Sequence, residues 1–236
     1  MGKRQKQKRQ LDEAHVLDQQ SEFKQIIIAK NEDQEEMLRT IDDNIITFVK
    51  GVPGSGKTYM AIYYALHQIF KKQYENIVFS RPVVEAAGEN LGFLPGNIAS
   101  KIDPYMVPIF DALSQMLPTD VIKSLMNKNG HDPIIKILPL AYMRGITHRN
   151  SIVVLDEAQN MTAGQMRMLL TRIGENTKMI ICGDILQSDI KVKNGLEDAF
   201  ERLQDIDGIS FVTLTDSLPR HPLIAKIEER YQMKYN

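Results

Sequence analysis

The sequence predicts an α/β fold in which helices cover both faces of a parallel β-sheet. Short runs rich in β-branched residues recur along the chain, and several are apolar without alternation, such as "SIVVLD" at 151–156. Such runs are typical of strands that are buried on both faces. Segments with helical spacing of apolar residues lie between them, and strands that alternate with helices favour a parallel sheet.

These two patterns predict where the strands and helices lie. Strands are expected at 45–49, 77–80, 134–138, 151–156, 179–182 and 209–214. Helices are expected at 57–71, 162–173, 195–204 and 222–233. A longer segment at 85–131 interrupts the alternation. We expect it to form a helical insertion that Pro104 and Pro108 break or kink.

The composition suggests one domain preceded by a basic arm. Residues 1–22 are expected to be a disordered arm, and residues 23–236 a single domain. The first ten residues contain five lysines and arginines and no acidic residue, although the net charge of the chain is −1. A solvated tail and an arm that contacts phosphate backbones are both consistent with this composition.

The apolar runs and the cysteine content exclude several classes of protein. No apolar run approaches the roughly 20 residues of a membrane-spanning helix, so we expect a cytoplasmic protein without a membrane partner. Cys182 is the only cysteine, which excludes an internal disulfide and a multi-cysteine metal site. We expect Cys182 to be packed within a strand rather than to act as a nucleophile.

The stretch "GVPGSGKT" matches G-x-x-x-x-G-K-[ST], the pattern of a phosphate-binding loop. It follows a predicted strand and opens a predicted helix, so that backbone N–H groups and the helix N-terminus can face an anion. We expect Lys57 to contact the β- and γ-phosphates as part of the catalytic set, and Thr58 to bind Mg²⁺. The expected phosphate-binding residues are Gly51, Val52, Pro53, Gly54, Ser55, Gly56, Lys57, Thr58 and Tyr59.

Two acidic residues follow the predicted strand at 151–156. Ligand sites of open α/β sheets lie at the carboxyl ends of the strands, so we expect Asp156 to bind Mg²⁺ there. Glu157 is then placed to act as the base for an attacking water, which favours hydrolysis over transfer to another acceptor. Gln187, in "CGDILQSD", could sense the γ-phosphate or belong to an ordinary strand-to-helix turn.

Several blocks of the sequence, spread over residues 25 to 230, stand out together. They are "GVPGSGKT", "SRPVVEA", "LGFLPG", "AYMRGITHRNSIVVLDEAQNMTAGQMRMLLTRIGEN", "CGDILQSD" and "LPRHPLI". These blocks resemble the PhoH family of P-loop ATPases. This resemblance implies a three-layer RecA-like P-loop NTPase domain related to the N-terminal motor domain of superfamily 1 helicases.

The resemblance also implies roles for five residues. Gln34 is expected to read adenine, which favours ATP, and Gln187 to sense the γ-phosphate. Arg220 stands where an arginine finger is suspected, in cis or in trans. Arg81 and Arg144 are candidates for contact with nucleic acid. Alternatively, Arg81 lies in a surface turn and Arg144 forms a structural ion pair.

The resemblance implies work on single-stranded nucleic acid, with RNA favoured, by an ATPase that uses Mg²⁺. The chain has room for one motor domain, so the rest of the site is expected from a neighbouring subunit of a ring, with a hexamer favoured. A phosphotransferase that acts on a small molecule or nucleotide is the first alternative. A slow nucleotide-gated binding or scaffold protein is the second.

Overall fold

The computed structural model describes residues 23–24, 27–82, 98–127, 132–190 and 193–217, together with Leu223, Lys226 and Arg230. These residues contain a six-stranded sheet with strand order β3-β2-β4-β5-β1-β6, and every neighbouring pair is parallel. The strands are β1 (Ile46–Gly51), β2 (Asn76–Arg81), β3 (Ile135–Pro139), β4 (Ser151–Leu155), β5 (Thr177–Gly183) and β6 (Ile209–Leu214). All six predicted strands are therefore confirmed.

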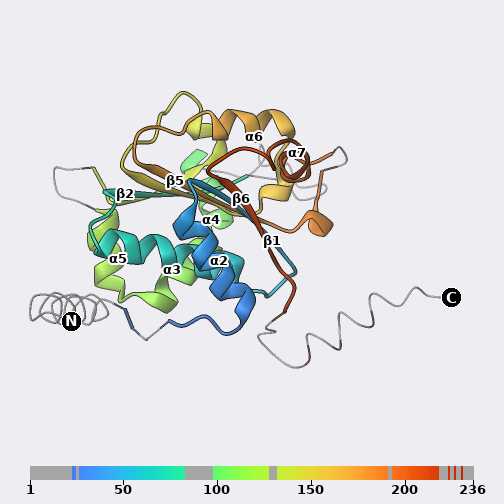
Figure 1. Ribbon diagram of the computed structural model, residues 1–236. Helices are drawn as coiled ribbons and strands as arrows, with labels where there is room; N and C mark the ends of the chain where they lie inside the picture. The colour runs from blue at the N-terminus through green and yellow to red at the C-terminus, as the bar shows by residue number, and fades with distance from the viewer. Residues whose placement is uncertain are drawn as a thin grey trace, which may run out of the picture.

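Helices cover both faces of this sheet (Figure 1). The α-helices are α2 (Glu32–Asp43), α3 (Lys57–Phe70), α4 (Ile98–Met116), α5 (Thr119–Met126), α6 (Ala163–Leu170) and α7 (Gly195–Arg202). Three short 3-10 helices follow strand ends: η2 (Leu140–Met143), η3 (Ala158–Asn160) and η4 (Ile185–Gln187). This three-layer arrangement confirms the predicted α/β fold class with a parallel sheet.

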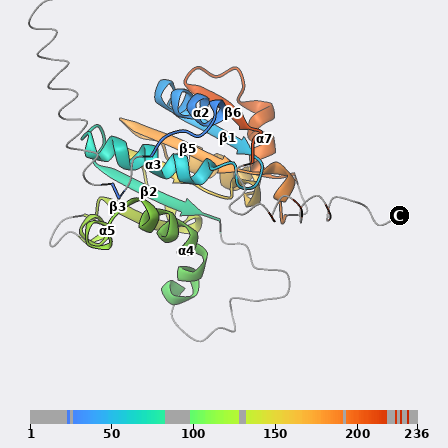
Figure 2. The ribbon, with the colours of Figure 1, turned by 90° about the horizontal axis from the view of Figure 1, so that it is seen from below.

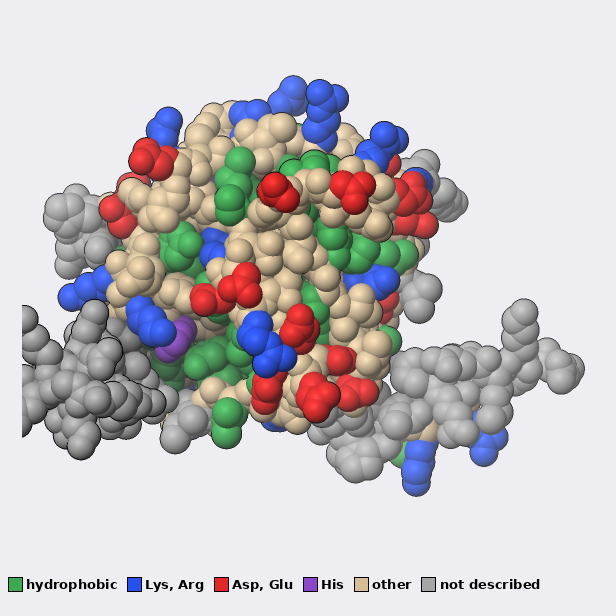
Figure 3. All heavy atoms as spheres, in the orientation of Figure 1, with side chains coloured by type: hydrophobic (Ala, Val, Ile, Leu, Met, Phe, Trp, Pro, Cys, Tyr) green, Lys and Arg blue, Asp and Glu red, His purple; other side chains and the backbone are tan. Residues whose placement is uncertain are grey.

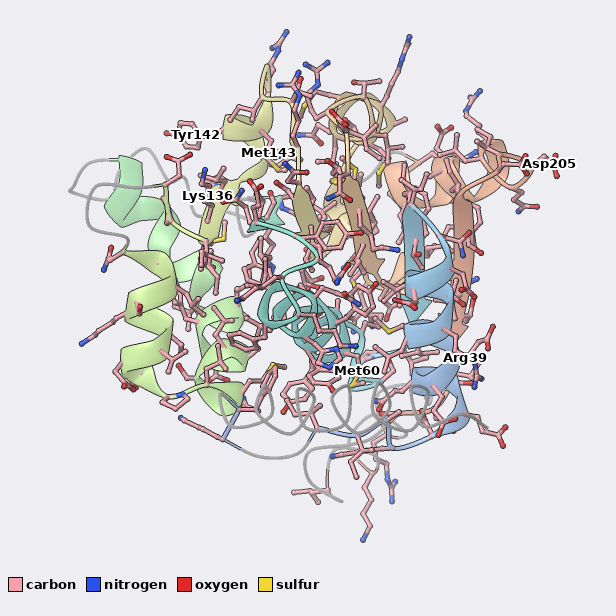
Figure 4. All side chains as sticks on the ribbon, turned by 60° about the vertical axis from the view of Figure 1, so that its left-hand side comes forward. Arg39, Met60, Lys136, Tyr142, Met143 and Asp205 are labelled. Carbon is pink, nitrogen blue, oxygen red and sulfur yellow. The ribbon has the colours of Figure 1, made fainter. Side chains whose placement is uncertain are left out.

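Successive side chains along each strand point to opposite faces of the sheet, so the core is divided into two layers. Val154 and Ile180 pack with α2, α3, α4 and α5 on one face, where Figure 2 shows α3 lying across the strands. Met60 of α3 lies inside that layer (Figure 4). Val153 and Ile181 point the other way and pack with α6, α7 and η2. Burial on both faces explains why these strands are continuously apolar.

Helix α2 was not predicted, because its sequence, "EDQEEMLRTIDD", is dominated by polar residues. The local signal for its start is Asn31, whose side chain accepts a hydrogen bond from the backbone N–H of Gln34 at 3.0 Å. Acidic residues in the first turn stabilise the helix, because their negative charge lies at the positive end of the helix dipole. Met37 and Ile41 are fully buried, so the helix is held by a narrow apolar stripe.

Helix α4 is not broken by its two prolines, and the kink that we expected as the alternative stays a prediction. It extends from Ile98 to Met116 as one helix, with Pro104 and Pro108 inside its range. Its buried residues Met106, Ile109 and Leu113 pack into the core at helical spacing, and this packing outweighs the local loss of backbone hydrogen bonds.

The remaining expectations for the ends of the chain are tested only in part. Residues 1–22 lie outside the described residues. Of the helix predicted at 222–233, only Leu223, Lys226 and Arg230 are described, and all three are helical. Among the described residues, no helix is both long and apolar enough to cross a bilayer. Cys182 is fully buried on β5, as expected for a packing residue.

Candidate active site

The glycine-rich loop joins the end of β1 at Gly51 to the start of α3 at Lys57. Gly56 has a φ of +88°, a left-handed conformation that side chains disfavour. A Cβ atom on Gly56 would lie 2.6 Å from Nε2 of Gln34, so the site also lacks room for a larger residue. The loop is therefore closely packed against Gln34 of α2.

Several features of the loop fit a phosphate group. The N-terminus of α3 faces the loop without a side-chain cap, so its first-turn N–H groups can bind an anion. The Oγ atom of Ser55 is buried without a hydrogen-bond partner among the described residues. Lys57 lies over the loop, where Nζ donates to the carbonyl oxygens of Gly51 at 2.6 Å and Val52 at 3.0 Å.

Thr58 and Asp156 lie in direct contact, although 98 positions separate them in the sequence. Oγ1 of Thr58 donates a hydrogen bond to Oδ1 of Asp156 at 2.6 Å. The contact brings together the two residues that the sequence predicted as Mg²⁺ ligands. A hydroxyl and one carboxylate are a suitable protein contribution for this ion, which takes its other ligands from water and substrate phosphates.

The electrostatic surroundings of Asp156 also suit a cation. Burial raises the pKa of the Asp156 carboxyl above its ordinary value, and the hydrogen bond from Thr58 partly opposes that rise. The nearby charge of Glu157 raises the pKa further, and the Arg81 guanidinium opposes that rise. A buried carboxylate next to a second carboxylate is costly without a compensating positive charge, and a bound divalent cation would provide one.

Glu157 lies beside Asp156 and is held by two neighbours. Its φ of +55° is unusual for a residue with a side chain. Oε1 of Glu157 forms an ion pair with Nη2 of Arg81 at 2.7 Å. Oε2 accepts a hydrogen bond from Nε2 of Gln159 at 2.5 Å. Arg81 therefore lies at the carboxyl edge of the sheet next to the acidic pair, and its contact with nucleic acid stays a prediction.

Sequence reasoning missed Gln159. Its side chain is 1% exposed and joins the ends of two strands. Nε2 donates to Glu157, which follows β4, while Oε1 accepts from the backbone N–H of Asp184, which follows β5, at 2.9 Å. The block "DEAQN" contains this residue, but its position in the sequence gives no sign of the contact with Asp184.

Gln34 lies against the glycine-rich loop. Its side chain is 3% exposed, Nε2 donates to the carbonyl oxygen of Ser55 at 2.9 Å, and Oε1 accepts from the backbone N–H of Lys30 at 2.9 Å. The amide is therefore fixed at the loop by one hydrogen bond through each of its two polar atoms.

The other predicted residues are less closely associated with the acidic pair. Gln187 ends η4 with an exposed side chain, and its backbone N–H donates to the carbonyl oxygen of Asp184 at 3.0 Å. Arg144 is exposed just after η2. In the same segment the side chain of Tyr142 points outward, whereas Met143 is buried (Figure 4). Arg220 lies outside the described residues.

The family model described as PhoH-like protein matches residues 26–232. The chain belongs to the PhoH family. It is 47% identical over 208 residues to the PhoH-like protein of Bacillus subtilis, covering 87% of this chain and 64% of that protein. It is 43% identical over 222 residues to the PhoH-like protein of Mycobacterium tuberculosis, covering 93% of this chain and 62% of that protein. The chain thus spans less than two thirds of the length of these PhoH-like relatives.

Solved structures with a similar arrangement include a helicase and a large terminase. The Pif1 helicase from Candida albicans matches with a TM-score of 0.41 and 15% identity, over 82% of this chain and 40% of the helicase. The large terminase from a thermophilic bacteriophage, in complex with ADP, matches with a TM-score of 0.47 and 13% identity, over 87% of this chain and 50% of the terminase.

Proposed function

We propose that this PhoH-family protein hydrolyses ATP in the presence of Mg²⁺ and couples hydrolysis to binding or remodelling of single-stranded nucleic acid, with RNA favoured. The observation that carries the ATPase half is the 2.6 Å contact between Thr58 and Asp156. It joins the phosphate-binding loop to the acidic pair at one edge of the sheet, as hydrolysis at a metal-bound triphosphate requires.

Each residue of the site has a separate role in this proposal. Lys57 and the first-turn N–H groups of α3 bind the phosphates, and Thr58 and Asp156 hold the metal. When bound, Mg²⁺ neutralises charge on the phosphate oxygens. Glu157 accepts the proton of the attacking water, while Gln159 fixes the direction of its carboxylate through Oε2.

The preference for ATP rests on Gln34. Its amide is anchored between Lys30 and Ser55, which keeps it at the rim of the glycine-rich loop. An amide can both donate to and accept from the exocyclic edge of adenine, whereas guanine presents a different pattern of donors and acceptors. We infer that a Gln34→Ala variant binds ATP more weakly and discriminates less against GTP.

The proposed nucleic-acid partner and ring assembly rest on the likeness of the family to helicase motor domains. Arg144 is exposed after η2, and basic side chains gather along the upper edge of the face shown in Figure 3, above α6. Phosphate backbones bind such cations with little dependence on sequence. A ring, with a hexamer favoured, would let Arg220 of one subunit complete the site of its neighbour.

The proposal is tested by measuring phosphate release from ATP and Mg²⁺ over a range of protein concentrations, with and without single-stranded RNA. We expect turnover in the wild type, stimulation by RNA and a specific activity that rises with protein concentration. Transfer of a labelled phosphate to another acceptor would contradict hydrolysis. Absence of stimulation by RNA and by single-stranded DNA would contradict the nucleic-acid half.

The Lys57→Ala variant tests whether the loop is responsible for turnover. The variant removes the ammonium group that we expect on the β- and γ-phosphates, so phosphate release should fall to background. Lys123→Ala is a matched control, since Lys123 is an exposed residue of α5. Equal turnover in the two variants would refute the role of the loop.

A further inference from the structure

We propose that Arg81 is a positioning residue that restrains Glu157, so that loss of their ion pair raises the rate of ATP hydrolysis. This inference rests on the proposed function, because it assigns a regulatory role within the same site. Its structural basis is the 2.7 Å contact between Nη2 of Arg81 and Oε1 of Glu157.

The sheet brings the two residues together directly. Strands β2 and β4 are neighbours, with Ser80 opposite Leu155 in the parallel register. The backbone N–H of Asp156 donates to the carbonyl oxygen of Ser80 at 3.0 Å, which continues the pairing by one residue. Arg81 and Glu157 therefore leave adjacent strands at the same edge, and the contact follows from the topology of the sheet.

Arg81 restrains one oxygen of the Glu157 carboxylate, and Gln159 already holds the other oxygen. Oε2 is bound by Gln159, which is itself fixed by the backbone of Asp184. Oε1 is bound by Arg81. A general base must direct an oxygen at the proton that it accepts, within hydrogen-bond distance. While both oxygens are held by protein donors, fewer orientations remain for a water molecule.

Arg81 is the more exposed of the two donors to Glu157. Its side chain is 20% exposed, whereas Gln159 is 1% exposed and joined to two strand ends. The left-handed backbone of Glu157 fixes the direction in which its side chain leaves the chain. The carboxylate can thus keep its contact with Gln159 when the guanidinium moves away, and Oε1 becomes available to water.

The test is the effect of Arg81→Gln on steady-state phosphate release from ATP with Mg²⁺. An ion pair of this exposure shifts the equilibrium between the restrained and the unrestrained Glu157 carboxylate by roughly two- to tenfold. We therefore expect kcat to rise by about that factor. The KM for ATP should stay within about twofold, because the effect acts through Glu157. Arg81→Lys keeps a cation and should restore a kcat near that of the wild type.

A matched control variant and a test in the Glu157→Gln variant separate this effect from a general disturbance of the fold. Arg39 lies on the outer side of α2 (Figure 4), where it pairs with Glu35 and Glu36 and is 62% exposed. Arg39→Gln makes the same chemical change and should leave kcat unchanged. In the Glu157→Gln background, Arg81→Gln should have no further effect, because the two residues act as one unit.

The outcomes distinguish this inference from the proposed function. If the wild type hydrolyses ATP and Arg81→Gln lowers kcat or leaves it unchanged, the restraint is refuted and the ATPase assignment stands. An increase in kcat that persists in the Glu157→Gln background also refutes it. If neither the wild type nor Arg81→Gln releases phosphate, the proposed function itself fails, and the inference fails with it.

Discussion

Asp156 and Glu157 are adjacent in sequence, yet their neighbours give them different chemistry. Asp156 is 7% exposed and contacts Thr58, whereas the side chain of Glu157 is 33% exposed and contacts Arg81 and Gln159. The buried carboxylate suits a metal ligand, and the more accessible one suits a group that must meet water. This difference is the physical reason for assigning the two roles in that order.

The role of Glu157 predicts a variant that binds nucleotide without turning it over. Glu157→Gln removes the proton acceptor and leaves the loop and Asp156 in place. We expect kcat to fall by about 100- to 10,000-fold, the usual contribution of a general base, with little change in ATP affinity. Equilibrium binding of a fluorescent ATP analogue and phosphate release would be measured together. Weak binding with substantial remaining turnover would reverse the assignment of base and metal ligand.

The environment of Asp156 predicts a gain in stability when its charge is removed. Because burial raises the pKa of this carboxyl in the folded protein, the folded state holds the proton more tightly than the unfolded chain. The free energy of unfolding contributed by this group therefore falls as the pH rises through the raised pKa. Without Mg²⁺ and nucleotide, Asp156→Asn should be more stable than the wild type at pH 7.

Urea unfolding of both proteins at pH 5 and pH 7 measures this effect. The advantage of Asp156→Asn should shrink at the lower pH, where the wild-type carboxyl is nearer to protonation. The variant should also lose activity that depends on Mg²⁺, as expected for a site that trades stability for function. A variant that is less stable than the wild type at both pH values would contradict this account of the site.

Among the secondary-structure elements, the carboxyl end of α2 depends on one lysine from the sheet. Lys178 of β5 is 6% exposed, and its Nζ donates to the backbone carbonyl oxygens of Ile41, Asp42 and Asn44. Burial lowers the pKa of Lys178, while the nearby carboxylates of Asp42 and Asp43 oppose that shift. The ammonium group satisfies carbonyls that a helix end leaves without partners.

Lys178→Met should therefore destabilise the fold. It preserves much of the side-chain volume but leaves the carbonyls of α2 without their donor, which costs about 2–4 kcal/mol in the free energy of unfolding. Lys193→Met is the control, because Lys193 is exposed and pairs with Glu201 at the surface. Its expected effect is within about 0.5 kcal/mol. Equal urea midpoints for the two variants would show that the cap contributes little.

The strands could be predicted from the sequence because burial on both faces produces a local, continuous apolar run. The loop could also be predicted, since its glycines and Lys57 lie within eight consecutive residues. Helix α2 and Gln159 could not be found in the same way. The stability of α2 depends on packing against α3 and β6, and the role of Gln159 depends on Asp184, which follows another strand. Both are tertiary effects with a weak local signature.

For the molecule as a whole, the parallel topology brings the site together. The carboxyl ends of β1, β2, β4 and β5 meet at one edge, and β5 lies between the strand that carries the loop and the strand that precedes the acidic pair. Gly183 at the end of β5 leaves room for Gln159, since a Cβ atom there would lie 2.7 Å from Oε1 of Gln159. The central claim is that the loop and the acidic pair bind one metal–triphosphate unit.

The most direct test of that claim is electron paramagnetic resonance of Mn²⁺ bound with a non-hydrolysable ATP analogue. We expect one nucleotide-dependent Mn²⁺ site, and both Thr58→Ala and Asp156→Asn should weaken Mn²⁺ binding at that site. Lys123→Ala should leave the signal unchanged. Mn²⁺ binding that survives both substitutions, or that is independent of nucleotide, would contradict the account.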